Sequence, residues 1–202
     1  MANKYFYLLF SATPYKMGHL VRCFTRSDYN HVSIMLDPNY EEMYSFARRN
    51  YYHPFYGGFV KESTDRFCLN GDVAEVKVCK IPISEDRLLN LKKRLNYMQE
   101  NEHEYLYNFL AIFGVAFKRN IKVKNAYTCI EFAVDVLSKS NFDISPNQYY
   151  DIYGLETLLD KYVIYQGPIS LTTYDEMFFE EIPHVYTKVV KNFAYLFLRK
   201  TN

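Results

Sequence analysis

Residues 31–48, HVSIMLDPNYEEMYSFAR, contain two short apolar runs separated by the turn residues Asp-Pro-Asn. The first run is rich in branched side chains, and a proline flanked by aspartate and asparagine ends it. Such a pattern predicts a strand, a tight turn and a returning strand. We therefore expect an antiparallel hairpin over these residues.

Further strands are predicted on both sides of this hairpin. The apolar run at 5–10 indicates a buried first strand, and the alternation of apolar and polar residues at 74–81 indicates another. A short edge element is expected at 57–62, GGFVKE. Apolar residues at helical spacing predict a helix over 15–25, between the first strand and the hairpin.

From residue 84 onward the pattern changes to helices. Residues 84–102 begin with a serine and two acids and then place apolar residues on one face, as a helix does. Residues 105–117 predict a buried helix or a mixture of strand and helix, and 145–161 predict one or two short helices. Residues 162–169 are a further strand candidate.

Strands first and helices later predict one α+β domain over 1–202, with an antiparallel sheet packed against helices. Its C-terminal extension, 165–202, is not placed by any pattern. The chain has 202 residues, 49% of them hydrophobic, so it can bury a sizeable core.

Composition excludes several classes of function. A net charge of +1 is too small for a typical nucleic-acid-binding protein, so no nucleic-acid partner is expected. The apolar run at 5–10 is too short for a signal peptide or a membrane span, which predicts a cytoplasmic protein without a span. The four cysteines are scattered and form no C-x-x-C pair, so we expect no metal and no cofactor.

Residues 125–137, NAYTCIEFAVDVL, place Cys129 at the start of a predicted helix. Thr128 and Glu131 have the spacing of a capping box, in which each side chain binds the backbone N–H of the other residue. The positive end of the helix would favour a thiolate at Cys129, and unpaired N–H groups there could hold an oxyanion. A lone cysteine at a helix start is also common in packing, so a nucleophile needs a base.

Among the five histidines, His31 is the best candidate for that base. It begins a strand after a polar segment, whereas Val32 and Ile34 point to the other face. A residue at the end of a rigid strand can be oriented by a neighbour across the hairpin. The alternative is a hydrogen-bonded histidine without a catalytic role.

The segments HVSI, MYSF and GGF, followed by YTCIEFAVDVL about a hundred residues after the histidine, resemble the permuted papain-like superfamily. This superfamily contains NlpC-type peptidases and lecithin–retinol acyltransferase-like proteins, and the likeness is closest to uncharacterised bacterial members. Along the chain, the strand that begins with the histidine precedes the helix that begins with the cysteine, as in the circularly permuted members of this superfamily. The resemblance implies a circularly permuted papain-like fold, with Cys129 as nucleophile and His31 as general base.

The third catalytic residue of this superfamily orients the imidazole from the strand that follows the histidine strand. Ser45 occupies the best-matching position, although a serine carries no charge that could stabilise an imidazolium. Glu42, near the turn, is a competing choice, and Glu62, after the double glycine, is a third.

The resemblance implies a cysteine-dependent amide hydrolase, a peptidase or amidase that acts through an acyl-enzyme on a small peptide, an amide or a cell-wall-derived fragment. One alternative is a lipid acyltransferase or esterase on the same fold, for which the sequence shows no amphipathic membrane anchor. The other is a binding module that has lost its catalytic residues, and Ser45 is its best argument.

Overall fold

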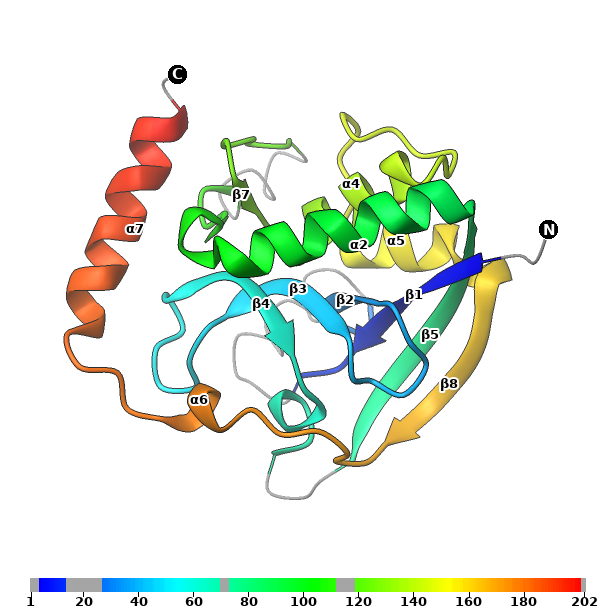
Figure 1. Cartoon of the computed structure of the whole chain (residues 1–202), viewed down its shortest axis with the longest axis horizontal. Coiled ribbons are helices and arrows are strands. Elements are labelled where there is room, and N and C mark those ends of the chain that lie inside the picture. The colour runs from blue at the N-terminus through cyan, green and yellow to red at the C-terminus, as the bar shows by residue number, and fades with distance from the viewer. Residues whose placement is uncertain (1–3, 14–26, 70–72, 112–118, 201–202) are drawn as a thin grey trace.

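Eight strands form one mixed, open sheet in the computed structural model, which describes residues 4–13, 27–69, 73–111 and 119–200. In the order of the sheet they are β7 (Ala126–Tyr127), β6 (Leu106–Tyr107), β4 (Gly57–Glu62), β3 (Met43–Arg48), β2 (His31–Met35), β1 (Lys4–Ser11), β5 (Ala74–Ile83) and β8 (Val163–Ile169) (Figure 1). Neighbours are antiparallel except for the short parallel pair β6 and β7. The α+β class is confirmed.

The predicted hairpin is present, since Ile34 on β2 pairs with Tyr44 on β3. The prediction that 57–62 forms an edge element is wrong. Strand β4 lies inside the sheet between β3 and β6. Its two glycines explain the position: a Cβ on Gly57 would lie 2.8 Å from the Tyr107 Cβ, so only glycine lets β6 approach this closely.

Three helices, α2 (Glu85–Glu100), α4 (Cys129–Lys139) and α5 (Ile152–Leu158), lie together on one side of the sheet (Figure 1). The main core is formed between them and the sheet; its largest buried side chains include Phe6, Phe10, Phe46, Phe59, Phe132 and Leu95. A smaller cluster covers the opposite face of the sheet, around Leu9, Met35, Met43, Phe67 and Val76. The sheet is therefore packed on both faces.

The C-terminal part of the chain continues from the sheet. Residue 165 lies within β8, which pairs with β5. The chain then passes below the sheet through α6 (Glu176–Phe179) to α7 (Val185–Lys200), which lies at the left of the molecule in Figure 1, opposite β8. The predicted helix at 15–25 lies outside the described residues, as do residues 112–117 of the element predicted at 105–117; the described beginning of that element contains the short strand β6.

None of the helices in the described ranges is both long and apolar enough to cross a membrane.

Candidate active site

Cys129 is the first residue of α4, and its predicted capping box is present. The Thr128 side-chain oxygen accepts a hydrogen bond from the Glu131 amide at 3.1 Å, and the Glu131 carboxylate accepts one from the Thr128 amide at 2.7 Å. Cys129 is 6% exposed. The capping box thus fixes the first turn of the helix, and with it the position of the sulfur beside the positive helix end.

His31 is the first residue of β2, and its imidazole lies between two side chains. Its Nε2 is 2.9 Å from Oε1 and 3.1 Å from Oε2 of Glu62. The Cys129 side chain is close enough to the imidazole to raise its pKa, both as a hydrogen-bond partner and through its charge. The structure therefore brings the two residues predicted as nucleophile and base together.

Glu62 ends β4 and reaches across β3 to β2. Its side chain is 2% exposed and accepts a hydrogen bond from the Ser33 hydroxyl. Burial alone would raise the pKa of Glu62. The charge and hydrogen bond of His31, the charge of Arg66 and the bond from Ser33 outweigh burial and lower it. Glu62 is thus an ionised, buried partner of the imidazole.

The same pair determines the charge of His31. Burial on its own lowers the pKa of the imidazole, because it disfavours the charged form. The Glu62 carboxylate and the neighbouring Cys129 outweigh this effect and raise the pKa to about 10. His31 is consequently an imidazolium at neutral pH, next to the sulfur that its charge can stabilise.

Ser45, the position that best matched the third residue, does not hold the imidazole. Its hydroxyl is fully buried without a hydrogen-bond partner in the described part of the chain. Within the described ranges, no hydrogen bond joins Glu42, near the turn, to His31. Glu62, the third candidate, takes this place because the sheet order sets β4 next to β3 and its side chain is long enough to reach β2.

Tyr107 on β6 is a neighbour of Cys129 that sequence reasoning did not single out. Burial raises the pKa of its phenol, and the negative charges of Cys129 and Glu131 raise it further. The phenol therefore stays protonated beside the sulfur and can act as a hydrogen-bond donor. No local motif indicates this residue, because its proximity depends on the pairing of β6 with β4 and β7.

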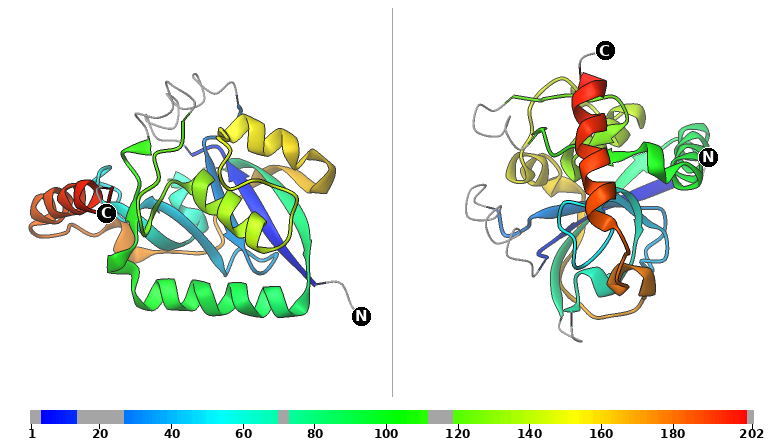
Figure 2. Two further views of the ribbon diagram at one scale, coloured as in Figure 1. Left: turned by 90° about the horizontal axis from the view of Figure 1, so that it is seen from above. Right: turned by 90° about the vertical axis from the view of Figure 1, so that its left-hand side faces the viewer.

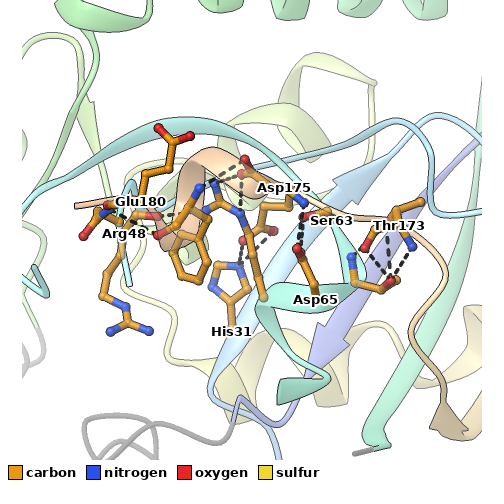
Figure 3. A network of polar contacts seen from close by, with 12 residues as sticks. His31, Arg48, Ser63, Asp65, Thr173, Asp175 and Glu180 are labelled. Carbon is orange, nitrogen blue, oxygen red and sulfur yellow. Dashed lines mark hydrogen bonds and ion pairs between the residues drawn. The ribbon is translucent and has the colours of Figure 1, made fainter. Parts of the chain in front are cut away.

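A polar network behind Glu62 connects the site to the C-terminal segment (Figure 3). Arg66 lies four residues after Glu62, and its guanidinium is 2.5 Å from the Asp175 carboxylate. The same guanidinium donates a 2.8 Å hydrogen bond to the Arg48 carbonyl and lies 4.3 Å from the centre of the Phe178 ring. The Asp65 carboxylate accepts a 2.6 Å bond from the Asp175 amide. The segment around Asp175 therefore supports the turn that directly follows Glu62.

We expect Asp175→Ala to lower the free energy of unfolding by about 3 kcal/mol, because it removes the carboxylate that pairs with the buried Arg66 guanidinium. Urea denaturation monitored by circular dichroism would measure the change. Glu85→Ala is the matched control: it breaks the exposed Lys4–Glu85 pair and should cost about 0.5 kcal/mol or less. Equal effects of the two variants would contradict the structural role of Asp175.

Two cavities of the described residues, of about 310 and 280 Å³, lie away from the sulfur. The larger is lined by His53, His184 and residues near the start of α7. The smaller is lined by the segment 120–127, by residues of α4 such as Glu131, and by residues between 146 and 150. Neither is lined by Cys129 or His31. Within the described ranges, no group of three or more His, Cys, Asp or Glu side chains is arranged to hold a metal ion.

Comparison of the chain with protein-family models, with curated proteins and with solved structures finds no match. The chemistry of the site is therefore inferred from its own geometry.

Proposed function

We propose that this protein is a cysteine-dependent amide hydrolase with a permuted papain-like fold. The observation that carries the proposal is the buried triad of side chains: Glu62 paired with Nε2 of His31, and Cys129 beside the same imidazole at the start of α4. A nucleophile, a base and an orienting acid are the parts that acyl transfer requires.

In the proposed mechanism the Cys129 thiolate attacks the carbonyl carbon of an amide and forms a tetrahedral intermediate. Backbone N–H groups at the start of α4 and the Tyr107 hydroxyl stabilise its oxyanion. The imidazolium of His31 donates its proton to the leaving amine, which departs and leaves a thioester. Neutral His31 then takes a proton from water, whose oxygen attacks the thioester; the carboxylic acid is released, and the Cys129 thiolate and the His31 imidazolium are restored.

Glu62 supports this cycle by holding the imidazole in one orientation and stabilising its charged form. The same carboxylate weakens the case for a binding module that has lost its catalytic residues, since that case depended on the uncharged Ser45. Because we expect a cytoplasmic protein, we propose small peptides, amides or cell-wall-derived fragments present there as substrates. A lipid ester could undergo the same steps.

Iodoacetamide labelling at pH 7.5 should modify Cys129 faster than the other two cysteines of the described ranges, because its sulfur lies at the start of α4 beside the His31 imidazolium. Cys68 and Cys79 are internal controls: burial raises the pKa of both thiols, that of Cys79 to about 12, so both should remain unmodified. Peptide mass spectrometry would measure the labelling rate at each cysteine, and a panel of peptide and amide substrates would be tested in parallel.

His31→Ala should slow labelling of Cys129 by about tenfold or more, because the imidazolium is lost. Ser45→Ala provides the matched control and should label at the wild-type rate. Equal labelling of Cys129 in both variants would contradict the proposed pair. Labelling that depends on His31, without hydrolysis of any amide, would favour ester substrates.

A further inference from the structure

Helix α7 is attached to the rest of the molecule along one side. Leu196 is fully buried in a cluster with Leu106, Leu110, Val123 and Ala126. Phe193 stacks on Phe109 with ring centroids 5.3 Å apart, and Arg199 donates a 2.7 Å hydrogen bond to the Glu104 carbonyl. These contacts hold the helix in one orientation, so its outer side is a defined surface.

That outer side is apolar and uncovered. Tyr186, Val190 and Phe197 are 77%, 68% and 58% exposed, and their spacings of four and seven residues place them in one row along the helix. Tyr195 and Leu198 are also exposed. Figure 2 (right) shows α7 crossing the face of the molecule that is turned to the viewer, with no other element in front of it.

The charges of α7 are all positive. Its sequence, VYTKVVKNFAYLFLRK, has four lysines and arginines and no acid, whereas the whole chain has a net charge of only +1. Lys188 and Lys191 are exposed in a second row, with Tyr195 and Leu198 at spacings of three, four and seven residues, on the other edge of the exposed side; the Lys188 ammonium also lies 5.7 Å from the Tyr56 ring. Pairing of α7 with a second copy would bring these like charges together, so the helix fits a negatively charged partner better than itself.

We propose that α7 docks the protein on an anionic lipid surface, lying in the plane of the membrane. An exposed apolar side with lysines along one of its edges is the pattern of an interfacial helix: the apolar side chains enter the headgroup region, and the ammonium groups remain near the phosphates. The protein would bind reversibly, through one face of a short helix. This inference concerns α7 alone and does not depend on the chemistry at Cys129.

Co-sedimentation of the full chain with lipid vesicles tests the proposal. The protein should bind vesicles that contain phosphatidylglycerol, release when salt is added, and not bind vesicles of pure phosphatidylcholine. Lys188→Gln/Lys191→Gln should weaken binding about 30-fold, since each cation near an anionic surface contributes about fivefold. Phe197→Ser should weaken binding roughly tenfold, because it removes a ring that would be buried in the headgroup region of the membrane.

Matched controls lie on α2, which carries exposed lysines of its own. Lys92→Gln/Lys93→Gln makes the same change in net charge and should bind like the wild type, as should Cys129→Ala. Thermal unfolding would verify that every variant is folded. The proposal would be overturned if the two lysine variants lost binding equally, or if the protein bound both kinds of vesicle equally. It would also be overturned if the protein bound no vesicles and instead formed a dimer that Phe197→Ser dissociates.

Discussion

Cys129→Ala should abolish amide hydrolysis, with kcat/KM reduced by about 10⁴-fold or more, because the proposed acyl-enzyme forms on the Cys129 sulfur. The fold should persist, since the Thr128–Glu131 capping box that starts α4 does not involve the sulfur. Steady-state kinetics on the best amide substrate would measure the loss, and circular dichroism would verify the helix content.

The control for this variant is Cys68→Ala, which removes another buried thiol. Cys68 belongs to the smaller cluster on the face of the sheet opposite the helices, where its Sγ lies 3.5 Å from the Ile169 carbonyl. Hydrolysis by this variant should stay close to the wild-type rate. Full activity in Cys129→Ala would exclude the proposed nucleophile, even if the fold were intact.

Glu62→Gln should have the second largest effect, because it removes the charge that keeps His31 protonated. Without the carboxylate, burial dominates and lowers the pKa of His31 from about 10. The alkaline limb of the kcat/KM profile, expected near pH 10 in the wild type, should therefore move to lower pH. Activity at neutral pH should fall by about 100-fold or more. Kinetics between pH 6 and 11 would measure both changes.

The same variant should be less stable, in a pH-dependent way. The pKa of His31 is raised from 6.5, so its contribution to stability is complete below pH 6.5 and is lost as the pH rises through about 10. The pKa of Glu62 is lowered from 4.5, so its contribution is present above pH 4.5 and is lost as the pH falls below it. Glu62→Gln should cost about 3 kcal/mol at pH 6 and much less near pH 10.

Ser45→Ala and Glu42→Gln separate this role of Glu62 from the other two candidates. The Ser45 hydroxyl has no hydrogen-bond partner within the described ranges, so its removal should leave stability and the pH profile nearly unchanged. Glu42→Gln should also keep the alkaline limb near pH 10. A shift of that limb in Ser45→Ala, with none in Glu62→Gln, would return the orienting role to the serine.

Predictions that depended on neighbouring residues agree with the structure. The 31–48 hairpin, the helix that begins after Ser84 and the strand at the start of β5 all follow from local alternation and turn residues. Two predictions that needed distant partners failed: the edge position assigned to 57–62, and the choice of Ser45 as the best match for the third residue. The outer face of α7 was missed for a related reason: apolar residues occur nearly all around this helix, and only the docking of Leu196 shows which side is left uncovered.

The sequence by itself determined where Cys129 stands. The two hydrogen bonds of the capping box span only three residues, so Thr128 and Glu131 suffice to make the cysteine the first residue of a helix. The tertiary structure alone decided which acid faces His31. Glu62 is 31 residues away in the chain, and it reaches the imidazole only because β4 joins β3 in the sheet and carries its side chain across to β2. Strand order and register are properties of the whole sheet, and no local pattern specifies them.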